Sequence, residues 1–309
     1  MNEEFSNLFG PEAPNRTAVS IGAFEGLHLG HRHILENTKA HAKNSGLMSA
    51  AVLFDPLPSQ FFGRLGANER ILLRNEQAEK LREIGIDHII FLPFSEKLAN
   101  LTPSEFLSAM QSRLHCEWLT MGDDFSIGKN RAGTAKVLAE LGSAFGYHAE
   151  IVRKDVMDGD VISSTRIRAL LHSGSLPEAN RLLGYSFFFS GNIIHGDARG
   201  RKLGFPTLNV KIPEGKLTLP NGVYATWNII DGQKYAAVTN IGVRPTFGLD
   251  AMGIFVESFL LNASGNFYGD NSRLEFIEML REEKRFSSAE ELKDQISKDI
   301  QHAQEILHD

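Results

Sequence analysis

The sequence has one cysteine, Cys116, and no long apolar run. A single cysteine excludes an intrachain disulfide and fits a reducing compartment. No apolar stretch approaches the roughly 18 residues that a membrane span needs, and the first residues have neither the basic nor the apolar region of a signal peptide. We therefore expect a cytoplasmic protein in which Cys116, flanked by apolar residues, is a buried small side chain.

Positive charge is not in excess either. The 32 Lys and Arg residues are outnumbered by 38 Asp and Glu, which gives a formal net charge of -6. A general nucleic-acid binder usually carries a basic face, so this balance argues against one. The 309 residues, 42% of them hydrophobic and 23% charged, suffice for two domains whose cores need no disulfide or metal.

From Thr17 to about Gly184, short apolar runs alternate with helical patterns. The predicted strands cover residues 17–22, 48–54, 88–92, 118–121 and 148–152. The predicted helices cover residues 31–44, 75–84 and 134–145, and a further helix opens at Thr102-Pro103. Strands that alternate with helices predict βαβ units on a parallel sheet.

After Gly184 the pattern changes to β-rich runs separated by Gly and Pro turns. These runs are residues 187–189, 191–195, 223–230, 235–239 and 255–261, and they predict a small antiparallel barrel or sandwich. Residues 288–307 predict one amphipathic helix with the apolar stripe Leu292, Ile296, Ile300, Ala303 and Leu307. A boundary near residues 183–190 divides the chain into predicted domains at residues 1–184 and 185–309.

The first predicted strand runs into a glycine-rich turn, residues 22–31, that leads into a helix. Exposed N–H groups and the positive end of a helix make such a turn an anion site. His28 and His31 flank Gly30, and imidazoles there could hydrogen-bond a triphosphate and stabilise the charge of the transition state. The sequence contains no Walker A loop and no G-x-G-x-x-G turn, so this would be a phosphate site of another kind.

A second candidate phosphate site begins a helix at residues 162–168. The hydroxyls of Ser164 and Thr165 and the free N–H groups suit phosphate, and Arg168 adds positive charge. Taken alone, the segment is only an N-cap followed by solvated arginines.

Together these two segments resemble the nucleotidyltransferase superfamily whose hallmarks are H-x-G-H near the first strand and I-S-S-T-x-x-R late in the domain. Residues 121–133 are similar to the G-x-D-F-x-F-G-x-x-R-x-G segment of bacterial FAD synthetases. The resemblance implies a Rossmann-like α/β fold in which the second substrate attacks the phosphate directly. It also implies a nucleotide site that contains Gly22, Phe24, His28, Gly30, His31, Asp124, Ser164, Thr165 and Arg168.

The second half contains a glycine- and base-rich loop, residues 196–209, that ends in Pro-Thr-x-Asn. Its glycines allow close backbone approach, and its basic residues attract phosphate. Thr207 and Asn209 offer hard neutral oxygens of the sort that Mg²⁺ accepts beside phosphates. The plain alternative is a solvated basic hairpin. Glu257, in an otherwise apolar strand, either faces solvent or serves as a base.

These features, with residues 221–224, 240–247, 268–269 and 280–286, resemble the riboflavin kinase module in the family's order. The chain from about Thr17 onward is therefore similar to the bifunctional prokaryotic riboflavin kinase/FAD synthetases. That resemblance implies a six-stranded β-barrel in the second half, with Glu257 as the general base on the 5′-hydroxyl of riboflavin. It implies ATP bound at Gly196, Arg201, Gly204, Thr207 and Asn209, with the last two holding Mg²⁺.

In the first half the resemblance implies that the phosphate of FMN attacks the α-phosphorus of a second ATP, so that FAD forms and pyrophosphate leaves. We expect riboflavin, FMN and ATP as partners, and neither nucleic acid nor a membrane; a homo-oligomer is an open alternative.

The chain departs from the family patterns at several positions. Ala23 and Glu25 stand where Asn and Asp are usual, Leu57 replaces a histidine, and Ser258-Phe259 replaces a common Thr-His. Most of these changes lie in the adenylyltransferase half, which suggests an intact kinase beside a weaker FAD synthetase. The alternatives are a monofunctional riboflavin kinase with a degenerate first domain, and a non-catalytic flavin- or nucleotide-binding regulator.

Overall fold

The computed structural model describes residues 7–194, 205–244, 253–263, 265 and 267–308. The chain divides into two compact units, Met1–Ser164 and Thr165–Asp309. Helices α8 and α9 lie in the second unit except for the first residue of α8. The domain boundary at residue 184 stays a prediction.

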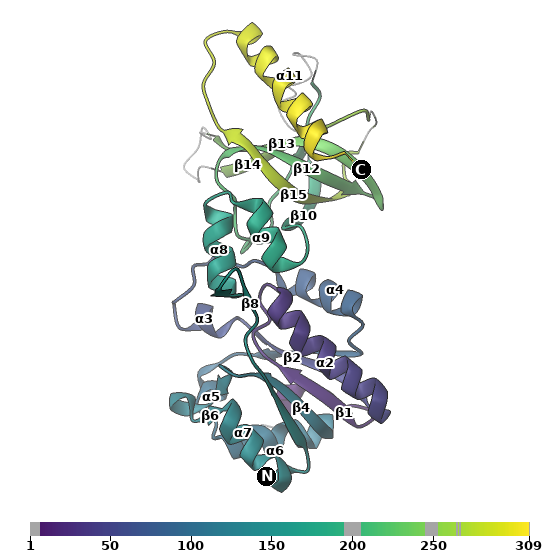
Figure 1. Ribbon diagram of the computed structural model, residues 1–309, viewed down its shortest axis with the longest axis vertical. Coiled ribbons are helices and arrows are strands. Elements are labelled where there is room, and N and C mark those ends of the chain that lie inside the picture. Colours follow the sequence, from purple (N-terminus) through teal and green to yellow (C-terminus); the bar gives the residue numbers. More distant parts are fainter. Residues whose placement is uncertain (1–6, 195–204, 245–252, 264, 266, 309) are drawn as a thin grey trace. The chain divides into compact units, whose positions relative to one another are not determined.

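The first unit is built on a five-stranded parallel sheet in the order β3-β2-β1-β4-β7 (Figure 1). The strands are β1 Thr17–Ile21, β2 Met48–Asp55, β3 His88–Pro93, β4 Cys116–Gly122 and β7 His148–Val152. The helices are η1 Asn7–Phe9, α2 Leu29–Ser45, α3 Pro58–Phe61, α4 Arg74–Ile84, α5 Glu96–Ala99, α6 Pro103–Leu114, η2 Lys129–Arg131 and α7 Ala135–Phe145. Two short ribbons, β5 Ser126–Ile127 with β6 Gly133–Thr134 and β8 Val156–Met157 with β9 Asp160–Val161, complete the unit. The predicted parallel α/β sheet is thus confirmed.

Local signals in the sequence explain where these helices begin and end. Thr102 caps α6 by accepting the N–H of Glu105 at 3.2 Å, while the Glu105 side chain accepts the N–H of Thr102 in return. Gly46 ends α2 in the left-handed region with φ 65°. Helix α2 begins two residues before the predicted start because His28 is its N-cap residue.

The core of this unit contains the predicted buried cysteine. Cys116 is 2% exposed and belongs to a cluster that includes Val19, Leu119 and Met110. Burial raises the pKa of the Cys116 thiol well above its ordinary value. The prediction of a buried small side chain is therefore confirmed.

The second unit is a closed antiparallel barrel in the order β10-β11-β14-β13-β12-β15. Its strands are β10 Phe188–Ile194, β11 Leu208–Val210, β12 Gly222–Ile230, β13 Gln233–Arg244, β14 Gly253–Leu260 and β15 Asn271–Glu282. Its helices are α8 Ser164–His172, α9 Leu176–Leu183 and α11 Ala289–Ile306. The sequence pattern predicts either a barrel or a sandwich, and the structure is a barrel.

The barrel has a partly polar interior. Thr226, Asn228, Thr239, Ser258 and Ser272 are all completely buried. Their side chains bond one another: the two threonine hydroxyls lie 2.7 Å apart, and that of Thr239 lies 3.0 Å from that of Ser258. Ser272 donates to Asn228 Oδ1 at 2.5 Å. Each buried group thereby has a partner, and the paired strands are linked inside the barrel as well as along their backbones.

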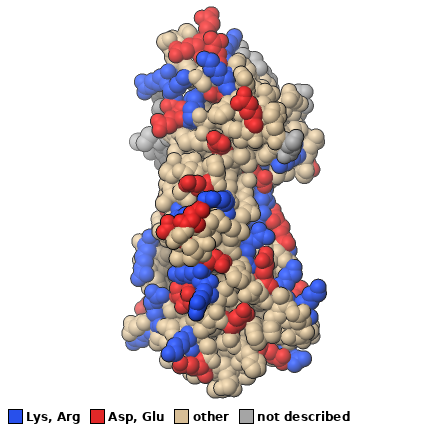
Figure 2. All heavy atoms as spheres, viewed as in Figure 1, with Lys and Arg blue, Asp and Glu red and all other residues tan. Residues whose placement is uncertain are grey.

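Helix α11 covers part of the barrel's outer face. Ile300, Ala303 and Leu307 of its predicted apolar stripe pack in one cluster with Ala225 and Trp227 of β12. Ser288 caps the helix by accepting the N–H of Glu291 at 3.1 Å. Among the residues described, no helix combines the length and the apolar character needed to cross a bilayer. Figure 2 shows acidic and basic side chains intermingled on the displayed face.

Candidate active sites

The predicted phosphate loop, residues 22–31, includes the connection from the end of β1 to α2 and the first residues of that helix (Figure 1). Phe24 and Leu27 have φ values of 45° and 41°, in the left-handed region that non-glycine residues rarely adopt. Both side chains are 1% exposed, so packing holds this conformation. A Cβ on Gly22 would meet the Phe24 ring at 3.0 Å, and one on Gly30 would meet the His28 ring at 3.4 Å.

The structure brings the two predicted histidines of this loop together. The rings of His28 and His31 are stacked with their centroids 3.6 Å apart, and the Phe24 ring meets His31 edge-on at 5.4 Å. Burial lowers the pKa of His28 to about 4, although the nearby Asp155 and Asp124 carboxylates oppose the shift. Burial and the neighbouring His28 also lower the pKa of His31. Both imidazoles are therefore neutral at pH 7, each with one N–H to donate.

Charged residues surround the start of α2. Asp124, a predicted nucleotide-site residue, pairs with Lys154 at 2.9 Å and is well exposed. Asp155 accepts from His33 Nδ1 at 3.1 Å, and its Oδ2 would lie 3.7 Å from a Cβ on Gly30. Lys154 and Asp155 belong to the loop after β7, and neither is predicted from the sequence because they match no motif.

The second predicted phosphate segment lies at the start of α8. Ser164 is the last residue of the first unit, whereas Thr165 and Arg168 belong to the second. The three residues therefore fall in two different units, and their role in nucleotide binding stays a prediction.

A cavity of about 700 Å³ in the first unit has a wall of aromatic side chains. Phe94 contacts the other three rings of this wall: its ring centroid lies 5.7 Å from that of Phe54, 5.3 Å from that of Phe61 and 5.8 Å from that of Phe62. Phe61 and Phe62 are 42% and 53% exposed, so this wall presents apolar ring surface to the cavity. The sequence gives one signal for this cavity, the Phe doublet just after the Pro56-Leu57-Pro58 break.

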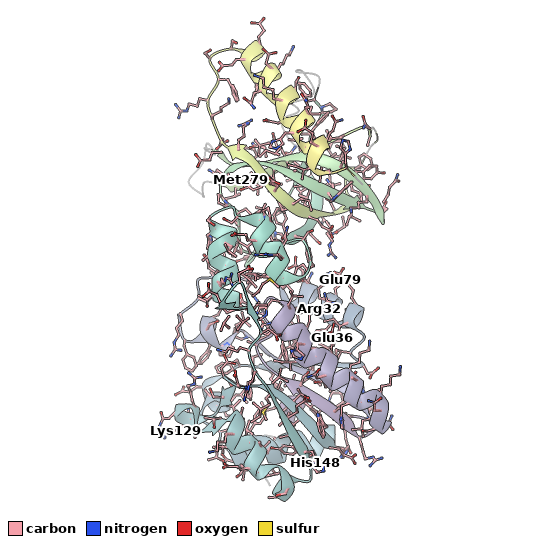
Figure 3. All side chains as sticks on the ribbon, in the orientation of Figure 1. Arg32, Glu36, Glu79, Lys129, His148 and Met279 are labelled. Carbon is pink, nitrogen blue, oxygen red and sulfur yellow. The ribbon has the colours of Figure 1, made fainter. Side chains whose placement is uncertain are left out.

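The lining of this aromatic cavity also carries positive charge. Lys129, Asn130 and Arg131 line it (Figure 3, where Lys129 is labelled). Asn130 and Arg131 both have left-handed φ values, 55° and 58°. Arg131 Nε donates to Ser126 Oγ at 2.7 Å, which fixes the turn. A flat aromatic group with an attached anion would suit these two kinds of lining together.

In the second unit, Glu257 lies at the centre of a row of paired residues. Its Cα partners are Asn209 on β11 and Asn240 on β13. Asn240 pairs in turn with Val223 on β12, and Val223 pairs with Arg281 on β15. Directly opposed residues share one face of a sheet, with Cβ atoms about 4.5–5.5 Å apart. The closed barrel therefore places the Glu257 carboxylate between two carboxamides.

This row, apart from Asn209, lines a cavity of about 330 Å³. Its polar lining includes Thr207, Asn240, Glu257 and Arg281, and its apolar lining includes Phe205, Val238, Phe259, Phe286, Leu292 and Ile296. Leu292 and Ile296 are the remaining members of the α11 stripe, so one end of the helix packs on the barrel and the other bounds the cavity. Glu257 is half-buried at this cavity, which fits a base better than a solvated surface residue.

A buried ion pair fixes α11 over this cavity. Asp299 is 5% exposed and accepts from Arg281 Nη2 at 2.8 Å and from Nε at 3.0 Å. Gln295 also donates to Asp299, at 2.8 Å. Because both oxygens of the carboxylate are bonded, the charges of Arg281 and Asp299 compensate each other in a site with little water.

The chemistry of the donor set fits Mg²⁺. Thr207 supplies a hydroxyl and Asn209, 9% exposed, a carboxamide, and Asn209 is the cross-strand partner of Glu257. In the described part of the chain no group of three or more His, Cys, Asp or Glu side chains could hold a metal, so an ion here would take neutral oxygens and phosphates. The predicted residues Gly196, Arg201 and Gly204 lie outside the described residues.

Four residues that depart from the family patterns have clear structural surroundings. Glu25 is 5% exposed, and its Oε1 accepts the N–H of Ile71 at 3.4 Å. Leu57 is 1% exposed and precedes α3. Ser258 belongs to the barrel interior, whereas the adjacent Phe259 lines the cavity. Each side chain is thus accommodated without a buried polar group being left unbonded.

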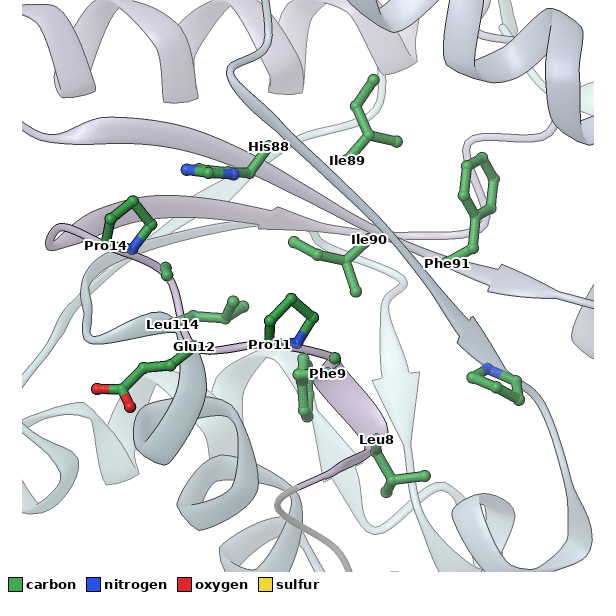
Figure 4. A pocket seen from close by; sticks show the side chains of 13 residues that line it. Leu8, Phe9, Pro11, Glu12, Pro14, His88, Ile89, Ile90, Phe91 and Leu114 are labelled. Atoms are coloured by element: carbon green, nitrogen blue, oxygen red, sulfur yellow. The ribbon is translucent and has the colours of Figure 1, made fainter.

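A third cavity, of about 520 Å³, lies between residues 8–14 and strand β3 (Figure 4). Its lining is mostly apolar, with Glu12 and His88 as the polar exceptions and no Lys or Arg. It therefore lacks the groups that phosphates need.

Comparisons with known proteins identify the family of each half of the chain. A family model described as FAD synthetase matches residues 10–166, and one described as riboflavin kinase matches residues 183–307. The bifunctional riboflavin kinase/FMN adenylyltransferase of Pseudomonas fluorescens is 36% identical over 93% of this chain and 92% of its own. The protein of the same description from Escherichia coli K12 is 34% identical, with 96% and 95% covered.

A solved structure agrees as well. A Streptococcus pneumoniae protein described as a macrolide-efflux protein superposes with a TM-score of 0.87 at 27% identity, over 97% of each chain. The two family models match in order, and the relatives exceed 30% identity over nearly the whole length. The chain therefore belongs to the family of bifunctional riboflavin kinase/FMN adenylyltransferases.

Proposed function

We propose that this chain phosphorylates riboflavin at the row of paired residues around Glu257 and adenylylates FMN at the phosphate loop that contains His28 and His31 (the His28/His31 loop). Both domains of the family are present in order, which favours the bifunctional enzyme over a monofunctional kinase or a regulator. One observation carries the residue assignment: the barrel register sets Glu257 between Asn209 and Asn240 at an apolar-walled cavity.

In the kinase site, the apolar wall takes the flavin ring and the Glu257 carboxylate accepts the proton of the 5′-hydroxyl. The hydroxyl oxygen then bonds to the γ-phosphorus of ATP, and the bond from that phosphorus to the ADP oxygen breaks. Thr207 and Asn209 would hold Mg²⁺, which neutralises phosphate charge when bound. A cavity of about 330 Å³ is at the lower end of the range for small-molecule sites, so it orders its ligand closely.

In the adenylyltransferase site, the start of α2 and the neutral N–H groups of His28 and His31 bind the triphosphate of ATP. A phosphate oxygen of FMN bonds to the α-phosphorus, and the bond to the β-phosphate oxygen breaks as pyrophosphate leaves. The histidine donors stabilise the charge that develops on the phosphate oxygens. The aromatic cavity with Phe61 and Phe62 takes the flavin ring of FMN.

The experiment that tests the residue assignment uses both activities of one chain. We expect Glu257→Gln to lower FMN formation from riboflavin roughly 100-fold or more, because the proton acceptor is lost. FAD formation from supplied FMN should stay at the wild-type rate, as measured by chromatography of FMN and FAD. A Glu257→Gln variant with full kinase activity would refute the assignment, and a wild-type protein that consumes no ATP with riboflavin would favour the regulator. The cytoplasmic location, and the absence of nucleic-acid and membrane partners, stay predictions.

A further inference from the structure

The phosphate loop is held from behind by a buried glutamine. Gln77, on α4, is completely buried, and its amide donates to the carbonyl oxygen of Phe24 at 3.0 Å. The same nitrogen lies 3.4 Å from the carbonyl oxygen of Ala23. In a trans peptide the C=O and N–H groups point in opposite directions, so fixing these two carbonyls also fixes the N–H directions of the next two residues.

Gln77 is itself fixed by an arginine. Arg70 is 8% exposed, and its Nη2 donates to Gln77 Oε1 at 3.1 Å. Its Nη1 donates to Asp55 Oδ1 at 2.7 Å, and Arg74 adds a longer contact of 3.4 Å to Asp55 Oδ2. The glutamine amide therefore has one orientation, with its oxygen on Arg70 and its nitrogen on the loop.

The network links the phosphate loop to the aromatic cavity. Asp55 is the last residue of β2 and directly follows Phe54, which lines that cavity. At the other end, Phe24 has a φ of 45° and places its ring edge against His31. A left-handed phenylalanine persists only where its surroundings hold it, and Gln77 is the buried side chain that bonds its carbonyl, beside the N–H of Leu27 at 3.3 Å.

We propose that Gln77 is a positioning residue for adenylyl transfer: it holds the Phe24 peptide so that His28 and His31 are set for the triphosphate. The proposal rests on the assignment of the His28/His31 loop to ATP given above. Gln77 touches neither substrate, and it acts through the backbone of the loop. Displacing catalytic groups by about 1 Å can cost on the order of 100-fold in rate.

The deciding variant is Gln77→Glu. It has nearly the same shape and keeps an oxygen for Arg70, but it replaces the amide donor by a carboxylate oxygen facing the Phe24 carbonyl. We expect kcat/KM for ATP in FAD formation to fall about 10- to 100-fold, mainly through a higher KM for ATP. The KM for FMN should change less than twofold, and riboflavin phosphorylation by the same molecules should be unchanged. Gln77→Met, which keeps the volume but bonds neither partner, should show the same split.

The matched control is Gln301→Glu, the same change at an exposed position on α11. It should leave both reactions at wild-type values. The fraction of folded first unit is measured by thermal unfolding, so that loss of fold is not counted as loss of positioning. If the wild type makes FAD but both Gln77 variants keep the wild-type KM for ATP, with only a lower yield of active protein, the proposal is overturned. A wild type that makes no FAD would instead refute the function assigned to the loop.

Discussion

In the first unit the residues proposed to hold ATP lie on a loop, whereas Glu257 in the second unit lies within the strands of a closed barrel. The loop has two left-handed non-glycine residues and depends on the buried side chains of Arg70 and Gln77. The barrel row depends on backbone register, which the pairing of β14 with β11 and β13 fixes on both sides of Glu257. The loop site should therefore be sensitive to substitutions that do not touch substrate, and the barrel site much less so.

The largest expected effect concerns the histidine pair. His28→Asn keeps an N-capping side chain for α2 but removes the imidazole that is stacked on His31. We expect FAD formation from FMN and ATP to fall roughly 100- to 1000-fold, because a preorganised donor to the developing charge is lost. Riboflavin phosphorylation by the same protein should be unaffected.

The third histidine of this segment is a matched control. His33 is exposed, and its contact is with Asp155 and not with the His28 and His31 rings. His33→Asn should change FAD formation less than about threefold. Equal losses in the two variants would show that helix α2, and not the imidazole pair, limits the reaction.

The next effect tests how α11 is held over the kinase cavity. Asp299→Ala leaves Arg281 charged and largely buried without its partner. Removing one member of a buried ion pair costs about 3–5 kcal/mol, so the second unit should unfold at clearly lower denaturant concentration. The KM for riboflavin should rise as well, because Leu292 and Ile296 of α11 line the cavity.

Asp294→Asn on the exposed side of the same helix is the control, and it should change the free energy of unfolding by less than about 0.5 kcal/mol. Urea titrations that report on the second unit distinguish the two variants. An Asp299→Ala protein as stable as the control would mean that apolar packing alone holds the helix.

A smaller effect would show that the two units use separate flavin cavities. Phe62→Ala removes an exposed ring from the first cavity, and Phe286→Ala removes a ring from the second. Loss of one aromatic contact is worth about 0.5–1.5 kcal/mol beyond the buried area, so we expect KM increases of roughly 3- to 10-fold. Phe62→Ala should raise only the KM for FMN in FAD formation, and Phe286→Ala only the KM for riboflavin in the kinase reaction. Steady-state kinetics of both reactions with both variants measure these values, and a variant that raises both KM values would contradict separate cavities.

The sequence predicts elements better than it predicts networks. The parallel sheet follows from strands that alternate with helical patterns, and the start of α6 follows from Thr102 and Pro103. In contrast, β15 is not predicted, because the charges of Arg273, Glu275 and Glu278 obscure the buried alternation of Ser272, Leu274 and Phe276. The motifs that name Glu257 also say nothing of its cross-strand partners, since register is set by pairing between distant segments.

The Arg70–Gln77 network is the clearest case of a feature that the sequence hides. Helix α4 begins Arg-Asn-Glu-Gln, which is typical of a solvated helix face, yet Glu76 is 2% exposed and Gln77 is completely buried. Polar residues become buried only where other segments supply partners. Here Asp55 bonds Arg70, and the carbonyl of Phe24 bonds Gln77. Such partners come from three separate segments, so no local pattern can reveal them.

The last comparison concerns how the stability of each unit responds to pH. Burial lowers the pKa of His28 from 6.5 to about 4. Between these pH values the unfolded chain binds a proton that the folded chain does not, so the free energy of unfolding of the first unit rises with pH and this stability is lost as the pH falls from 6.5 toward 4. Inside the barrel, Thr, Ser and Asn side chains hydrogen-bond one another, and none of them titrates in this pH range.

We therefore expect His28→Asn to flatten the pH dependence of the first unit by up to about one proton, with no change in the second. Urea titrations at several pH values between 4 and 7, on the variant and the wild type, give the difference in slope. Carboxylates that do not interact with His28 contribute equally to both proteins and cancel in this difference. Parallel pH profiles would mean that His28 is solvated, and its imidazole would then be charged below pH 6.5 instead of acting as the neutral donor on which the proposed ATP site depends.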